Sequence, residues 1–156
     1  MKIRKAQIKD LSEIDEIYQE GQLDEEENKF SRKSKKEILK ELDKSKKLRL
    51  NGFRKAINSS KEKFLVLEEK DKLIGFGDAV LSNKKRNAEV ALIYVKREYR
   101  RKGIGKKLLK ELLKWLKEKG ESKVFVTMDI ENNSSINLNK QVGFRESIVI
   151  MEKKLK

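Results

Sequence analysis

An apolar run at residues 88–95, followed closely by a strongly amphipathic segment, constrains the fold of this chain more than any other feature. Glu89 is the only charged residue of that run, which is otherwise typical of a central strand buried on both faces. After a basic loop, an apolar stripe at helical spacing predicts a helix that ends at Gly120. The stripe consists of Ile104, Leu108, Leu109, Leu112, Leu113 and Leu116. We therefore expect a sheet with helices on both of its sides.

The remaining periodicities complete a mixed α/β fold, and 156 residues fit a single domain. Other strands are expected at residues 1–6, 64–69, 73–81, 123–128 and 148–151, with a tight turn at residues 70–72. Other helices are expected from Leu11 to Gly21, from Ser31 or Ser34 to Ile57 with an interruption at Gly52, and at residues 134–141. The acidic stretch at residues 23–28 is expected to be a loop. The predicted order is β-α-α-β-β-β-α-β-α-β.

The residue types that are missing exclude several kinds of chemistry. The chain has no Cys and no His, so disulfides, zinc-thiolate sites, a cysteine nucleophile and a histidine base are excluded. Acid-base chemistry must use Glu, Asp, Tyr, Lys, a chain terminus or water. No loop has the Asp-rich spacing of a Mg²⁺ or Ca²⁺ site, so we expect no metal. No apolar run approaches the roughly 20 residues that cross a bilayer, so we expect a cytoplasmic protein that does not enter membranes.

The charge of the chain is unevenly distributed. The formal net charge is +14, yet residues 1–30 are net acidic and the remainder is strongly basic. A basic body attracts polyanions such as nucleic acid, coenzyme A or acidic membranes. Aromatic residues are few and are not interleaved with the basic positions, as a stacking platform for nucleic acid would need. A nucleic-acid partner is therefore the less favoured interpretation.

A basic loop with two glycines joins the buried strand to the amphipathic helix. It includes Arg100, Arg101, Lys102, Gly103, Ile104, Gly105 and Lys106. A helix N-terminus leaves backbone N–H groups without partners and carries a partial positive charge, so it can bind a phosphate. The spacing matches neither a Walker loop nor a dinucleotide fingerprint. The alternative is that both glycines only permit a tight turn between strand and helix.

This segment resembles the acetyl-CoA signature of the GNAT superfamily of N-acetyltransferases, Gln/Arg-x-x-Gly-x-Gly/Ala. Tyr94-Val95 before it is also typical of the family, as is the later Asn132 with Gly143-Phe144. The resemblance covers residues 63–150 well and the N-terminal helices loosely. It implies a mostly antiparallel sheet that is splayed at the cofactor site, with residues 63–150 as the acetyl-CoA-binding core and residues 1–60 as the acceptor-site helices.

The resemblance also implies which groups bind the cofactor. The pantetheine would lie between the two central strands and pair with backbone groups of Ile93 and Val95, beside Tyr94. The amides from Arg101 to Lys106 would bind the pyrophosphate, with Arg100 at the start of the motif. Asn132 and Asn139 would belong to the second cofactor helix.

Two residues are candidates for catalysis. Glu89 stands where several GNAT enzymes have a glutamate base, and removing a proton from a lysine-like amine at pH 7 costs roughly 4.6 kcal/mol. The alternative for Glu89 is a solvated residue at a strand end.

Asn139 falls where the family often has a tyrosine acid, but an amide has no useful proton to give, so it would only donate a hydrogen bond. Solvent, Tyr94 or Tyr99 would then protonate the thiolate of the departing coenzyme A. The alternative for Asn139 is an exposed helix residue.

The acceptor is expected to be a cationic amine. In the family the first two helices wall the acceptor site, and here that region carries Asp10, Glu13, Asp15, Glu16, Glu20 and the acidic residues 24–27. A polyamine, a lysine side chain or a peptide N-terminus would suit such a wall, unless the acids only line a solvated face. We therefore expect an acetyl-CoA-dependent N-acetyltransferase, monomeric or homodimeric, that uses direct attack in a ternary complex. The alternatives are a CoA-binding regulatory protein with little turnover and a basic nucleic-acid-binding protein.

Overall fold

The computed structural model describes residues 1–27, 33–84 and 87–148 of the chain. Within these ranges five strands form one sheet in the spatial order β1-β2-β3-β4-β5. They are β1 (Lys2–Lys5), β2 (Glu62–Glu69), β3 (Lys72–Val80), β4 (Ala88–Val95) and β5 (Val124–Phe125). Neighbouring strands are antiparallel, except that β4 and β5 are parallel. The predicted mixed, mostly antiparallel sheet is confirmed.

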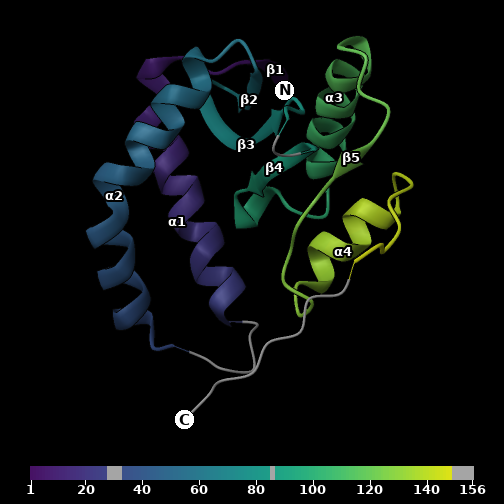
Figure 1. Cartoon of the computed structure of the whole chain (residues 1–156). Coiled ribbons are helices and arrows are strands. Elements are labelled where there is room, and N and C mark those ends of the chain that lie inside the picture. The colour runs from purple at the N-terminus through teal and green to yellow at the C-terminus, as the bar shows by residue number, and fades with distance from the viewer. Residues whose placement is uncertain (28–32, 85–86, 149–156) are drawn as a thin grey trace.

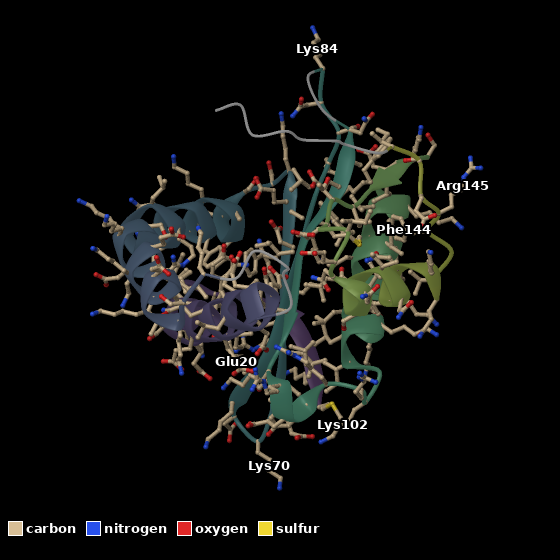
Figure 2. All side chains as sticks on the ribbon, turned by 90° about the horizontal axis from the view of Figure 1, so that it is seen from below. Glu20, Lys70, Lys84, Lys102, Phe144 and Arg145 are labelled. Carbon is tan, nitrogen blue, oxygen red and sulfur yellow. The ribbon has the colours of Figure 1, made fainter. Side chains whose placement is uncertain are left out.

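Helices cover both faces of this sheet. α1 (Leu11–Glu27) and α2 (Lys35–Asn58) lie on one face, and α3 (Ile104–Glu118) and α4 (Asn133–Lys140) lie on the other (Figure 1). Figure 2 shows the sheet nearly edge-on between these two pairs of helices, with Glu20 on the α1 side. Short 3-10 turns, η1 (Ile8–Asp10) and η2 (Arg97–Tyr99), precede α1 and α3. The layers therefore follow the prediction.

Each face of the sheet has its own hydrophobic core. On one face Leu108, Leu112 and Leu116 of α3 are fully buried against the strands. α3 lies close to β3 because Gly77 has no side chain, since a Cβ atom there would be 3.0 Å from Cδ1 of Leu112. On the other face Ile14 of α1 and the ring of Phe53 of α2 pack in one cluster with the rings of Phe64, Phe76 and Tyr94 from the sheet. The two cores explain why β3 is buried almost throughout.

The turn between β2 and β3 forms as predicted. Lys70 and Asp71 both have positive φ, at 49° and 60°. Two consecutive residues in this region make a hairpin turn whose twist matches the right-handed twist of the strands. The tight connection sets Glu69 opposite Lys72 and Glu68 opposite Leu73, and a bulge beyond Glu68 then shifts the register that ends with Glu62 opposite Val80.

A β-bulge in β4 decides which side chains face α1 and α2. Asp78 of β3 lies opposite Leu92, whereas Ala79 lies opposite Val90, so Ala91 is an extra residue in β4. Val90 therefore packs with α3, and Leu92 and Tyr94 pack on the α1 and α2 side. Because side chains alternate along a strand, Glu89 lies on the same face as Leu92 and Tyr94.

Two glycines predicted to end or interrupt helices lie inside them. α1 continues through Gly21 to Glu27, so the acidic residues 24–27 form its last turn and the predicted loop is wrong. The lack of a side chain at Gly21 leaves room for the ring of Tyr94, which a Cβ atom there would overlap. α2 runs without interruption through Gly52, where a Cβ atom would meet open space. Neither glycine ends its helix. The low helix propensity of glycine is outweighed by the contact with Tyr94 at Gly21 and by the rest of the helix at Gly52.

Other boundaries differ less from the predictions. Ser34 is the N-cap of α2, since its hydroxyl accepts from the Glu37 N–H while the Glu37 carboxylate accepts from the Ser34 N–H. β5 covers only two residues of the predicted strand 123–128. The predicted last strand begins at Ile148, which has no regular structure, and its remaining residues lie outside the described ranges.

Candidate active site

The sheet opens between β4 and β5. These strands pair only at Ala88 with Val124 and at Glu89 with Phe125. From Val90 to Val95 this edge of β4 has no strand partner among the described residues, so its backbone groups face an opening. Ile93, Tyr94 and Val95 lie along this stretch, as a ligand that pairs with their backbone would require. The opening matches the predicted splay.

The N-terminus of α3 lies beside the end of that open edge. Gly103 is the N-cap, its φ is 74°, and no side chain caps the helix. The first helical bond runs from the Lys107 N–H to the Gly103 carbonyl, so the N–H groups of Ile104, Gly105 and Lys106 have no acceptor within the described part of the chain. Such groups, together with the helix dipole, favour an anion. This geometry fits a pyrophosphate.

The two glycines of the motif have different structural roles. A Cβ atom at Gly103 would meet nothing within 4 Å, so the position is needed for its left-handed backbone and its open approach. A Cβ atom at Gly105 would lie 3.2 Å from Cδ2 of Leu138, so this glycine lets α3 and α4 lie close together.

The basic residues of the motif also have different surroundings. Arg101 and Lys102 are exposed and Lys106 is half-buried near the free amides, whereas Ile104 belongs to the core. The guanidinium of Arg100 instead donates from Nε to the Val95 carbonyl at 2.7 Å and pairs with Asp24 of α1 at 2.5 Å. Its side chain therefore joins the loop to α1, and any contact with a phosphate from this residue would come from its backbone.

Contacts around η2 extend this link between α1 and the loop. The carboxylate of Asp24 also pairs with the guanidinium of Arg97. Glu20, one turn earlier on α1, accepts a hydrogen bond from the backbone N–H of Arg97 at 2.5 Å. We call Glu20, Asp24, Arg97 and Arg100 the α1 clamp. The sequence contained no signal for this clamp beyond the charges of its members.

Glu89 is the second residue of β4 and is half-buried. Its pairing with Phe125 places it where β4 and β5 separate, and the bulge turns it toward the α1 and α2 side. Its carboxylate has no hydrogen bond or ion pair within the described ranges. A carboxylate at the base of the opening can accept a proton from a ligand that enters there.

Asn139 is buried, with 7% of its surface exposed, so the alternative of an exposed helix residue is wrong. Its Nδ2 donates to the Ser135 carbonyl at 2.9 Å, and because a carbonyl only accepts, the orientation of the amide is fixed. Its Oδ1 is buried and has no partner among the described residues. The sequence predicted a donor here, but the amide presents an acceptor. An N–H or S–H group of a ligand would satisfy it.

Asn132 caps α4 and reaches across to α1. Its Oδ1 accepts from the Ser135 N–H at 3.0 Å, and its Nδ2 donates to Glu25 at 3.3 Å. Glu25 also accepts from Gln22 and from the hydroxyl of Tyr94. No local sequence pattern marks Gln22 or this arrangement, because the partners come from segments that lie far apart along the chain.

The two tyrosines considered as acids have different surroundings. Burial, and then the charge of Glu25, raise the pKa of Tyr94, so its phenol stays protonated at neutral pH. Its hydroxyl also accepts from Nε2 of Gln22 at 2.7 Å. Tyr99 packs on the α3 side, and the ammonium of Lys102 lies 5.3 Å from its ring centroid. Only Tyr94 thus directs its hydroxyl toward α1.

The described ranges contain neither a metal-binding cluster nor a membrane-spanning helix. Within the described ranges no three acidic side chains come together as a metal ion would require. No helix there has the length and apolar character that crossing a membrane demands.

Comparison with known proteins connects this geometry to one family. Residues 14–144 match the model of the acetyltransferase (GNAT) family. An uncharacterized N-acetyltransferase of Methanocaldococcus jannaschii is 30% identical over 103 residues, which are 63% of this chain and 46% of that protein. The match thus spans less than half the length of that relative.

Solved structures show the same fold. The PaiA N-acetyltransferase of Thermoplasma acidophilum, in complex with coenzyme A, has a TM-score of 0.79 at 27% identity, covering 92% of this chain and 89% of that one. The aminoglycoside 6'-N-acetyltransferase of Acinetobacter haemolyticus has a TM-score of 0.68 at 16% identity, and each chain is covered completely. The second likeness concerns the fold alone.

Proposed function

Since this chain belongs to the acetyltransferase (GNAT) family, we propose that it transfers the acetyl group of acetyl-CoA to a primary amine. The observation that carries the proposal is the uncapped N-terminus of α3 beside the unpaired edge of β4. The N-terminus of α3 suits a pyrophosphate, and the unpaired edge of β4 suits the amides of a pantetheine chain. Acetyl-CoA would supply the reactive thioester.

Different residues of the site would bind different parts of this cofactor. Backbone groups of Ile93 and Val95 would pair with the pantetheine, and the amides from Arg101 to Lys106 would bind the pyrophosphate. The buried Oδ1 of Asn139 would accept a hydrogen bond from the cofactor, which removes the cost of leaving it unpaired, about 1–3 kcal/mol. No metal ion is part of the proposal.

Glu89 would act as the base. The acceptor nitrogen must lose a proton before it forms a bond to the thioester carbon and the carbon–sulfur bond breaks. A carboxylate at the start of β4, on the face of Leu92 and Tyr94, can take this proton directly or through a water molecule. The thiolate that leaves has an ordinary thiol pKa of about 8.5, so solvent can supply its proton.

Calorimetry and a turnover assay together test the proposal. Coenzyme A should bind in isothermal titration, and a thiol reagent should detect its release from acetyl-CoA over a panel of amines. Glu89→Gln should lower kcat about 100-fold while the Kd for coenzyme A is unchanged. Glu69→Gln is a matched control, because Glu69 is also a half-buried glutamate at a strand end. Equal activity of Glu89→Gln and the wild type would contradict the base.

A second candidate function is a CoA-binding regulatory protein with little turnover. It is favoured by Asn139, which has no proton to transfer at neutral pH. The same two measurements distinguish the candidates, since a regulator would bind coenzyme A and release no thiol with any amine in the panel.

A further inference from the structure

Two acidic residues of α1 that were expected to wall the acceptor site instead contact the loop before α3. Oε1 of Glu20 accepts from the Arg97 N–H at 2.5 Å and lies 3.8 Å from the guanidinium of Arg100. The carboxylate of Asp24 pairs with the guanidinium of Arg97 and, at 2.5 Å, with that of Arg100. Glu20 and Lys102 of the loop lie toward the same end of the sheet (Figure 2). The α1 clamp thus joins the end of α1 to the segment that leads into α3.

The burial of Asp24 makes this link stronger than an ordinary surface contact. Exposed ion pairs contribute little, because water screens them and both side chains must be ordered. Asp24 is only 8% exposed, and its carboxylate meets two guanidinium groups. Removing one partner from a buried pair is costly, because the remaining charge is left without compensation. The charge of Asp24 is therefore important for the link.

The loop that the clamp contacts has a backbone conformation that needs support. Arg101 has φ 63° and Gly103 has φ 74°. The left-handed region is uncommon for a residue with a side chain, and such a residue persists where surrounding contacts impose its conformation. On the strand side of the loop these contacts come from Tyr99, which packs in the α3 core, and from the α1 clamp.

We propose that Glu20 and Asp24 are positioning residues for the cofactor, which hold the loop of pyrophosphate-binding amides in place and do not bind the acceptor. This inference rests on the proposed function. The two acids act through Arg97 and Arg100, so they need no contact with coenzyme A. A loop that spends less time in its binding conformation has an apparent affinity reduced by the same fraction.

The sign of the effect distinguishes positioning from a simple effect of charge. A carboxylate close to a pyrophosphate repels it, so removing the acid would strengthen the binding of coenzyme A if charge alone mattered. If the acid holds the loop, its removal weakens binding. The two explanations predict opposite changes in the Kd of the same variant.

Isothermal titration with coenzyme A is the central test. Asp24→Asn keeps the shape of the side chain and removes its charge, and it should raise the Kd about 10-fold or more. Glu20→Ala removes the acceptor of the Arg97 N–H and should raise the Kd about 3- to 10-fold. Glu20→Gln keeps an oxygen that can accept this bond and should stay within about threefold of the wild type.

Glu98→Gln is the matched control. Glu98 lies in η2 between the two arginines of the clamp, is exposed, and has no hydrogen bond or ion pair within the described ranges. The variant removes the same charge from the same turn without touching the clamp, so its Kd should be unchanged or slightly lower. Thermal melts show which variants are folded. Glu20 is half-buried, so Glu20→Ala carries the test if Asp24→Asn does not fold.

Kinetics separate positioning of the cofactor from a general structural role. In Asp24→Asn the KM for acetyl-CoA should rise about 10-fold, while the KM for the amine and kcat at saturating acetyl-CoA stay within about threefold. S-acetylpantetheine has the thioester and the amides of the cofactor but no pyrophosphate. Its kcat/KM should therefore fall less than that of acetyl-CoA.

The possible results separate this inference from the proposed function. Unchanged or tighter binding of coenzyme A in both Asp24→Asn and Glu20→Ala, or an equal loss in Glu98→Gln, would overturn the inference. A rise in the KM for the amine that equals the rise for acetyl-CoA would overturn it as well, since the acids would then also act at the acceptor site. Binding of coenzyme A without turnover would contradict acetyl transfer, and the titrations would still decide the inference. Absence of coenzyme A binding in the wild-type protein would overturn the proposed function itself.

Discussion

Gly21 of α1 lies directly against the ring of Tyr94 in β4, and a Cβ atom at Gly21 would overlap Cδ1 and Cε1 of that ring. A glycine inside a helix costs about 1 kcal/mol relative to alanine. Here it allows α1 to approach β4 closely enough for Gln22 and Glu25 to reach the Tyr94 hydroxyl. The contact therefore links the packing of α1 to the geometry of the site.

Replacing Gly21 by alanine should destabilise the protein by about 1–3 kcal/mol, because the ring of Tyr94 must move and this exceeds the gain in helix propensity. Gly52→Ala makes the same change in α2, where a Cβ atom meets open space, and should stabilise by about 0.5–1 kcal/mol. Urea unfolding of both variants measures the difference. The same sign of change in both would contradict the close contact.

Substitutions at Gly103 should separate backbone conformation from side-chain size. Gly103→Val forces a β-branched residue to φ 74° and should lower the affinity for coenzyme A at least tenfold, because the free amides of α3 lose their arrangement. Gly103→Asn should lose less, since asparagine tolerates this conformation. Titration calorimetry gives both values. Full affinity in the valine variant would show that the loop does not hold the phosphates.

Asn139→Leu removes a buried amide whose oxygen has no partner in the described residues. If this oxygen contacts the cofactor, the variant should bind coenzyme A about 5- to 150-fold more weakly, which corresponds to about 1–3 kcal/mol. The unliganded variant should be as stable as the wild type or more stable, because an unpaired buried acceptor has been removed. Unchanged affinity, measured by the same titration, would place Oδ1 away from the ligand.

The pair of Arg4 and Asp10 should make stability depend on pH in the acidic range. Burial would raise the pKa of Asp10, but hydrogen bonds from Arg4 and from the Gln7 N–H outweigh it, so the pKa is lowered. A carboxylate with a lowered pKa stabilises the fold above its unfolded pKa of about 3.9, and this contribution is lost as the pH falls through the folded value.

Asp10→Asn should therefore be less stable than the wild type by about 1–3 kcal/mol at pH 7, with a difference that shrinks below about pH 4. Thermal unfolding at several pH values measures this. Glu41→Gln, which removes an exposed pair with Lys33, should change stability by at most about 1 kcal/mol. A difference for Asp10→Asn that is constant down to pH 2 would contradict the assignment.

The strand–loop–helix from Ala88 to Glu118 could be predicted from sequence because its signals are local. An apolar run, two glycines and a regular leucine stripe all lie within about thirty residues. The free amides after Gly103 follow from the same segment, since a helix start with no capping side chain leaves them unpaired.

Features that depend on distant contacts could not be predicted. Gly21 looks like a helix end until Tyr94 is placed against it. The side chain of Arg100 looks like a phosphate ligand until Asp24 is brought beside it. The extra residue Ala91, which turns Glu89 toward α1, is visible only once β3 and β4 are paired. Each of these needs the register or the packing of elements far apart in the chain.

The α1 clamp has a consequence for redesigning the specificity of this protein. Asp24 and Glu25 are adjacent in sequence, yet Asp24 pairs with Arg97 and Arg100 before α3, whereas Glu25 contacts Asn132 at the start of α4. A mutant library aimed at new acceptors should therefore spare Glu20 and Asp24, because their contacts hold the loop that is proposed to bind the cofactor. Randomising the whole helical turn would instead disrupt these contacts, and far fewer of its variants should bind coenzyme A.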